Sequence, residues 1–306
     1  MYRGISSRNR MFSLIAVLAL VLGGCQSEQS SDDAGENNAT RANVDATSRA
    51  NGNTASSAAV GAGPARPVKS QMMPYTESGD ELVYGYFSAP DDMFEPLPAV
   101  IMIHEWWGLN DNIRSVADRL AGEGYVVFAV DLFSGGVANS PEDARELMLQ
   151  VVEDPEAAND NLRAAYEFVN EIVGAPRIGS LGWSFGGGWS LNTAGLYPEE
   201  LDAVVIYYGQ VTNDEDVLRP IGAPILGLFA AEDTDIKAAS VEAFRAALTR
   251  LRKNFEVHIY PEVGNAFANP GGSNYDAATA EDAWRRTLEF LNHHLSINES
   301  AVQPSG

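Results

Sequence analysis

Apolar residues along this chain follow two alternating patterns. Short continuous apolar runs are typical of strands that are buried on both faces of a sheet. Between them, apolar residues recur every three to four positions, as on a helix with one buried face. The first pattern and two weaker runs predict strands over residues 82–88, 99–103, 125–130, 177–181, 203–208, 224–230 and 255–260. The second predicts helices over residues 113–121, 141–152, 161–173, 186–197, 237–251 and 284–295.

Strands that alternate with helices indicate an α/β fold. Repeated strand–helix units form a mostly parallel sheet with helices on both faces. In such sheets, ligands bind beyond the carboxyl ends of the strands. The chemically useful residues at these ends are His104 with Glu105, Asp131, Ser184, Asp233 and the loop after Tyr260.

The segment 182–186, Gly-Trp-Ser-Phe-Gly, fits the pattern G-x-S-x-G. It lies between a predicted strand and a predicted helix, which is the setting of the nucleophile elbow in α/β-hydrolases. The flanking glycines fit because the serine backbone is strained there and the strand and helix pack closely. We therefore predict an α/β-hydrolase fold with Ser184 as nucleophile.

A serine hydroxyl needs a base, and the base needs an orienting acid. In α/β-hydrolases the acid follows the serine in the chain, and a histidine follows the acid. Asp233 comes just after the predicted strand 224–230 and is our candidate acid. The alternative is that Asp233 caps the next helix; Glu232 and Asp235 are weaker candidates for the acid. The oxyanion hole would use the backbone N–H groups of Phe185 and Trp106.

Over nearly all of residues 72–295 the chain resembles the dienelactone hydrolases. The resemblance implies the α/β-hydrolase fold and hydrolysis of a small ester or lactone without a cofactor. The founding members of that family carry a cysteine at the elbow, whereas many relatives carry a serine, as here. The matching segments are 104–109, 131–133, 182–187, Asp233, 260–267 and 283–288.

The catalytic histidine of the family falls at Asn265 in this chain. A neutral amide cannot act as a general base, although it can hold a water molecule or a substrate by hydrogen bonds. Three explanations follow: another base, an inactive fold that binds a small molecule or a partner, or weak hydrolysis. In the last case, the oxyanion hole and positioning alone leave roughly 10³–10⁴-fold acceleration over water.

Glu105 is the candidate for another base. It matches a family glutamate that contacts the nucleophile in the resting enzyme. Burial beside Trp106 and Trp107 would raise its pKa toward the range that suits a base. His104 would point to the opposite side if the alternation of the strand persists.

The family members that cleave dienelactones hold the substrate carboxylate with two arginines. The corresponding stretches here contain Ser134-Gly135-Gly136 and Ala268-Asn269. The chain also has a formal net charge of −22. A neutral ester or lactone is therefore the expected substrate.

The first residues are typical of a bacterial lipoprotein signal. Three arginines precede an apolar stretch over residues 11–22, and the segment 22–25, Leu-Gly-Gly-Cys, resembles a lipobox. The alternative is a plain secretory signal. Cys25 is the only cysteine, so no intrachain disulfide can form.

We expect an exported protein that is anchored to the bacterial cell envelope through a lipid on Cys25. The expected segments are a signal peptide over 1–24, a disordered tether over 25–70, the hydrolase domain over 71–296 and a flexible tail over 297–306.

Other chemistries are disfavoured. The acidic net charge repels nucleic acid and anionic lipid head groups. His104-Glu105 does not start a zinc-protease motif, because Gly108 stands where the second histidine is required. The glycines at 186–188 lack the spacing of a nucleotide-binding loop. We predict no metal, no cofactor and no nucleic-acid partner.

Overall fold

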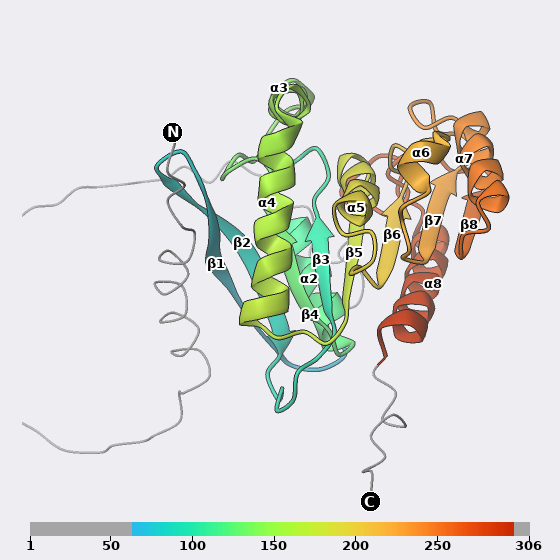
Figure 1. Ribbon diagram of the computed structural model, residues 1–306. Coiled ribbons are helices and arrows are strands. Elements are labelled where there is room, and N and C mark those ends of the chain that lie inside the picture. The colour runs from blue at the N-terminus through green and yellow to red at the C-terminus, as the bar shows by residue number, and fades with distance from the viewer. Residues whose placement is uncertain (1–62, 297–306) are drawn as a thin grey trace, which may run out of the picture. The chain divides into compact units, whose positions relative to one another are not determined.

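Eight strands pair into one sheet in residues 63–296, the part of the chain that the computed structural model describes (Figure 1). The strand order is β1-β2-β4-β3-β5-β6-β7-β8. Strands β3 to β8 run parallel, while β2 is antiparallel to both β1 and β4. The mostly parallel sheet confirms the predicted fold class. The strands are β1 (Val68–Ser78), β2 (Glu81–Pro90), β3 (Ala99–Ile103), β4 (Val126–Val130), β5 (Ile178–Trp183), β6 (Ala203–Tyr207), β7 (Ile225–Ala230) and β8 (Phe255–Tyr260).

Helices cover both faces of the sheet. Helices α2 and α8 pack on one face, and α4, α5 and α7 on the other, so that α4 and α5 stand in front of the sheet in Figure 1. Polar side chains cap several helix starts: Asn110 accepts a hydrogen bond from the N–H of Ile113 at the start of α2. The helices are α2 (Asp111–Gly122), α3 (Pro141–Glu153), α4 (Pro155–Glu167), α5 (Phe185–Leu196), α6 (Glu215–Leu218), α7 (Ala238–Arg250) and α8 (Ala277–Leu295), and a π-helical turn, η2 (Phe168–Ile172), follows α4.

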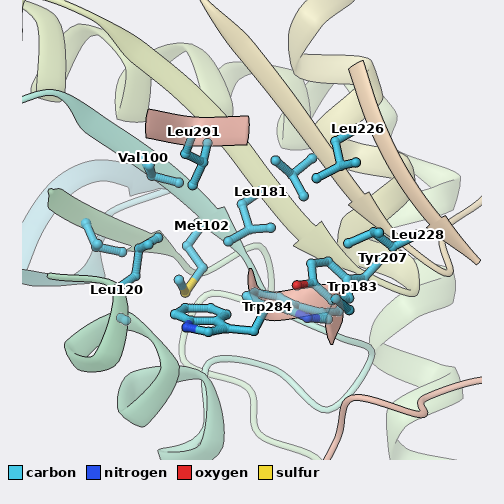
Figure 2. Close-up of a cluster of buried hydrophobic side chains, with 14 of the residues drawn as sticks. Val100, Met102, Leu120, Leu181, Trp183, Tyr207, Leu226, Leu228, Trp284 and Leu291 are labelled. Atoms are coloured by element: carbon cyan, nitrogen blue, oxygen red, sulfur yellow. The ribbon is translucent and has the colours of Figure 1, made fainter. Parts of the chain in front are cut away.

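The core beneath α2 and α8 is built from alternate residues of the central strands (Figure 2). Met102, Leu181 and Leu228 are completely buried there. Full burial of such a side chain contributes about 1.5–3 kcal/mol. The polar end of Tyr207 is satisfied, because its hydroxyl and that of Thr287 on α8 lie 2.7 Å apart in a hydrogen bond. This layer holds the strand ends rigidly in place.

Strand β1 was not predicted from the sequence. It begins at Val68, so the folded domain starts before residue 71, and the end of the predicted tether belongs to the sheet. β1 lies at the edge, where Met73 and Tyr75 are buried while most neighbouring side chains are not. A bulge between Pro74 and Thr76 also shifts its register with β2. The alternation of buried and exposed residues along β1 is therefore too short to distinguish this strand, in the sequence, from the polar segment before it.

Helix α4 begins earlier than predicted. Asp154 ends α3 and caps α4, because its side chain accepts a hydrogen bond from the N–H of Ala157. Pro155 then occupies the first turn of α4, where its missing N–H costs nothing. The predicted helix over 161–173 is therefore the second half of α4 followed by η2.

Residues 1–62 and 297–306 lie outside the described part of the chain. The signal peptide, the lipidated Cys25, most of the tether and the tail therefore stay predictions. Within residues 63–296, no helix is long and apolar enough to cross a membrane.

The first turn of α5 lies directly against the sheet. A Cβ atom on Gly186 would overlap the carbonyl oxygens of Ile103 and His104 at the end of β3. A Cβ atom on Gly187 would lie 2.9 Å from the Cα of Gly209, just after β6. Glycine is required at both positions because no side chain fits between the two backbones.

We expect Gly186→Ala to lower the free energy of unfolding by about 3 kcal/mol or more, because the new methyl group must push α5 off β3. Gly195→Ala is the matched control in the same helix, since a Cβ there meets nothing within 4 Å. That change should leave stability equal or raise it by up to about 1 kcal/mol. Urea unfolding followed by circular dichroism measures both, and equal midpoints for the two variants would contradict the close packing.

Candidate active site

Strained backbone gathers where the strands end. Among residues 63–296, five of the six non-glycine residues with a positive φ angle lie in the loops that follow β4, β5, β6 and β8. They are Ser134, Ser184, Tyr208, Glu262 and Ala266. Such conformations cost of order 1–3 kcal/mol each and cluster at functional sites. The strain therefore points to the same edge of the sheet as the sequence did.

Ser184 lies on the sharp turn between β5 and α5, with φ 51° and ψ −115°. Its N–H donates to the carbonyl of Tyr207 over 2.9 Å, and its carbonyl accepts from the N–H of Gly187 over 3.0 Å. The residue is half-buried and lines a large cleft. Among the described residues, no group forms a hydrogen bond with its Oγ atom. The hydroxyl is therefore open to a molecule in the cleft.

Two backbone N–H groups lie beside this cleft without an acceptor. Neither the N–H of Phe185 nor that of Trp106 donates to another described residue, and both residues line the cleft. Phe185 is the first residue of α5, where helical N–H groups have no partner within the helix. Trp106 follows the end of β3. The two predicted oxyanion-hole donors are thus both available.

Asp233 is buried in the loop after β7 and accepts three hydrogen bonds. Its Oδ1 accepts from the N–H groups of Asp235 and Ile236, and its Oδ2 accepts from Asn265 Nδ2 over 2.8 Å. It does not cap α7, whose N-cap residue is Lys237. Asp233 and Asn265 therefore make the contact that an acid and a histidine make in a triad.

The orientation of the Asn265 side chain follows from its partner. A carboxylate only accepts, so the amide nitrogen must face Asp233. The carbonyl oxygen Oδ1 consequently points away, and Asn265 lines the cleft. This oxygen accepts no hydrogen bond from a described residue. It offers the cleft an acceptor without usable proton affinity.

Glu105 is buried beside the cleft, with 4% of its surface exposed. Its Oε1 accepts from the Tyr208 hydroxyl over 3.3 Å and its Oε2 from Asn269 Nδ2 over 2.5 Å. Burial raises the pKa of Glu105 to about 7, while these two hydrogen bonds oppose the rise. Neither oxygen is hydrogen-bonded to Ser184. The pKa of the Glu105 carboxyl group therefore lies near neutrality, and both of its oxygens are held by residues other than Ser184.

Tyr208 and Asn269 are the site residues that the sequence did not reveal. Tyr208 follows β6 directly, so the rule that selects strand ends could have found it. Asn269 was considered only because a family arginine is missing in that stretch. Its Oδ1 accepts from the N–H of Gly271, which turns its Nδ2 toward Glu105. That orientation depends on a loop conformation and leaves no pattern in the sequence.

His104 points away from the cleft and acts as a structural residue. Its Nε2 accepts from the N–H of Leu132, so the proton lies on Nδ1, which donates to the carbonyl of Glu105 over 2.6 Å. Complete burial lowers the pKa of His104 and keeps the ring neutral. Asp131 accepts from the N–H groups of Phe133 and Gly135 and shapes the same loop. Neither His104 nor Asp131 lines the cleft.

The cleft has a volume of about 1570 Å³. Ser184, Trp106, Tyr208, Asn265 and Asn269 all line it. The predicted nucleophile therefore lines the same cleft as the residues that form hydrogen bonds with Asp233 and Glu105. An arginine also lines it, Arg145 of α3, at neither of the two positions where the family would place one. Within residues 63–296, no three His, Cys, Asp or Glu side chains are grouped so that they could hold a metal ion.

The family model of the dienelactone hydrolases matches residues 83–295. The chain belongs to the dienelactone hydrolase family. This match confirms the resemblance that the sequence motifs indicated. It also confirms the α/β-hydrolase fold and the membership of the chain in a family of hydrolases.

Two relatives illustrate the similarity. Protein usf of Aquifex pyrophilus is 32% identical over 235 residues, covering 74% of this chain and 99% of the relative. A provisionally named carboxymethylenebutenolidase of Escherichia coli K12 is 32% identical over 222 residues, covering 68% of this chain and 82% of the relative.

Solved structures agree in fold. A provisionally named dienelactone hydrolase from Klebsiella pneumoniae has a TM-score of 0.61 at 28% identity and covers 74% of this chain and 98% of its own. The dienelactone hydrolase-like promiscuous phosphotriesterase P91 from metagenomic libraries has a TM-score of 0.68 at 20% identity, covering 75% of this chain and 99% of its own. At that identity, P91 supports the fold alone.

The raised pKa of Glu105 predicts a pH-dependent effect on stability. Between pH 4.5 and about 7 the folded chain holds the Glu105 proton that the unfolded chain loses, so stability falls as pH rises through this window. One pKa unit is worth about 1.4 kcal/mol, so Glu105→Gln should raise the free energy of unfolding by up to about 3 kcal/mol at pH 8. At pH 4 the gain should vanish.

The glutamine can keep both contacts, because its oxygen accepts from Asn269 and its nitrogen donates to the Tyr208 hydroxyl. Urea unfolding at pH 4 and pH 8 measures the difference. Glu232→Gln is the control, because Glu232 lines the same cleft but is exposed. A Glu105→Gln effect of equal size at both pH values would show that Glu105 titrates normally.

Proposed function

We propose that this member of the dienelactone hydrolase family cleaves neutral carboxylic esters or lactones with Ser184 as the nucleophile. The observation that carries the proposal is the strained turn that directs Ser184 at the cleft, beside the unpaired N–H groups of Phe185 and Trp106. Donors aimed at a developing oxyanion are commonly the largest electrostatic contribution to acyl transfer.

In the proposed reaction, Ser184 Oγ attacks the ester carbonyl carbon and its proton passes to the Glu105 carboxylate. The Phe185 and Trp106 N–H groups bind the oxyanion of the tetrahedral intermediate. When the intermediate collapses, the bond to the alcohol breaks and Glu105 returns the proton to the leaving oxygen. Water then attacks the acyl-serine by the same route and restores the free hydroxyl.

Glu105 fits the base because its pKa of about 7 makes it half ionised at neutral pH. It is held by Tyr208 and Asn269 and not by Ser184, so the proton must travel through one bridging water or after a rotation of the Glu105 side chain. Asn265 Oδ1 would hold the attacking water, with its amide fixed by Asp233.

The contact between Asn265 and Asp233 also supports a second function. An amide in the place of the catalytic histidine is what a family member retained for binding would carry. In that case the cleft holds a small molecule or a partner and Ser184 has no chemical role.

Hydrolysis of p-nitrophenyl acetate by the wild-type protein and Ser184→Ala separates the two. We expect Ser184→Ala to lose about 100-fold or more in kcat/KM, because the nucleophile is gone. The wild-type rate should rise with pH through about 7, since the base works only when Glu105 is ionised. Glu105→Gln should remove that rise. Equal background rates in the wild type and Ser184→Ala would favour the binding function.

Asn265→His tests whether the ordinary base is missing. A histidine here can donate to Asp233 Oδ2 through one nitrogen and offer the other to the cleft. General-base catalysis contributes typically 10²–10⁴-fold, so kcat/KM should rise by about 100-fold if the wild type is slow. Glutamine at position 265 is the control, because Asn265→Gln keeps an amide. No gain over a fast wild type would instead identify Glu105 as a sufficient base.

A further inference from the structure

The cleft is larger than a small ester requires. Pockets that enclose drug-sized ligands measure about 300–1,000 Å³, whereas this cleft measures about 1570 Å³. Ser184 and its oxyanion donors occupy only one part of it. The remaining space extends away from the reacting atoms.

One helix forms the floor of this extension. Gly188, Asn192 and Gly195 of α5 all line the cleft, and their spacing of three to four residues places them on one helix face. The rise of about 1.5 Å per residue puts Gly195 about 16 Å from Ser184 along the helix axis. At the far end, Asn192 Nδ2 donates to Asn159 Oδ1 of α4 over 2.7 Å. We name this channel over Gly188, Asn192 and Gly195 the α5 groove.

Apolar side chains of two other helices line the same cleft as the α5 groove. Met148, Leu149 and Val152 lie on one face of α3 and line the cleft, and Val217 of α6 lines it too. Leu149 is 40% exposed, Val152 56% and Val217 50%. Three of the eight large apolar side chains that the described residues expose are therefore gathered at this one cleft. Such gathering marks a binding surface, whereas scattered exposed apolar residues need no explanation.

The small floor residues leave room for a narrow occupant. A Cβ atom on Gly195 would meet nothing within 4 Å, and one on Gly188 would have its nearest neighbour at 3.4 Å. Asn192 is the one floor residue with a side chain, and its amide nitrogen is held by Asn159 of α4. A floor that is bare at Gly188 and Gly195 fits an unbranched hydrocarbon chain better than a bulky branched group. Since the groove opens at Ser184, such a chain would be attached to the carbonyl that Ser184 attacks.

We infer that the α5 groove binds the unbranched apolar acyl chain of the ester substrate, an inference that rests on the proposed esterase function. The substrate class is then an ester of a medium-length fatty acid and not a short acetate. Each CH₂ group that leaves water for the groove strengthens binding by up to about fourfold.

The test compares p-nitrophenyl decanoate with p-nitrophenyl acetate, because a decanoyl chain that starts at Ser184 is long enough to approach Gly195. For the wild type, kcat/KM for the decanoate should exceed that for the acetate by about tenfold or more, because eight further CH₂ groups enter the groove. Gly195→Leu places a side chain at the end of the groove and should lower this decanoate-to-acetate ratio by about fivefold. Gly195→Ala is the matched control, because alanine and leucine have similar helix propensity but alanine adds one carbon only.

A second pair of variants tests the walls. Leu149→Gln replaces an apolar wall residue by a polar one and should lower the ratio. Leu82→Gln is the control, because it removes a leucine of β2 that is also exposed, 52% against 40% for Leu149, but does not line the cleft. A wild-type ratio near one would overturn the inference. So would a Gly195→Leu ratio equal to that of Gly195→Ala.

Binding to Ser184→Ala separates this inference from the proposed function. Decanamide should bind about tenfold more tightly than acetamide. Tryptophan fluorescence measures the binding, because Trp189 lines the cleft. If the wild type hydrolyses no ester but this preference holds and is lost in Gly195→Leu, the groove stands and the esterase proposal fails. Equal binding of the two amides overturns the groove, whatever the esterase activity.

Discussion

The site depends on the contact between backbones at the start of α5. Because Gly186 and Gly187 carry no side chains, the first turn of the helix rests on the carbonyl groups at the end of β3 and on Gly209 after β6. This contact forces the chain through the strained turn at Ser184 and directs the N–H of Phe185 outward. It also ties three strand ends together, so that loops far apart in the sequence meet around one cleft.

The two carboxyl groups of the site have different environments. Asp233 accepts three hydrogen bonds from N–H donors, two of them from the backbone. Glu105 has only a hydroxyl and an amide as donors, and burial outweighs these two hydrogen bonds and raises its pKa. A carboxyl group that exchanges its proton near neutrality, Glu105, and one that is held by three N–H donors, Asp233, therefore belong to the same site.

The sequence predicts β3, β4, β6 and β7 well because each is a continuous apolar run with no polar interruption, as in Val126–Val130. The elbow is predicted because its glycines and serine are contiguous. β1 is missed because an edge strand with few buried residues resembles the polar segment before it. The contacts of Tyr208 and Asn269 with Glu105 join residues more than a hundred positions apart, and they depend on loop conformations that no periodicity encodes. In the sequence, Met148, Leu149 and Val152 of α3 have the spacing of an ordinary buried helix face. The structure shows that Leu149 and Val152 are exposed.

The irregular edge strand β1 has a consequence for contacts between molecules. An open strand edge is a template on which a strand of another chain can add by main-chain hydrogen bonds. Proline at position 74 removes one donor from β1, and the adjacent bulge breaks the even spacing of the others. A strand of another molecule therefore cannot form a long regular ladder of hydrogen bonds with β1. This hinders extension of the sheet from one molecule to the next at this edge.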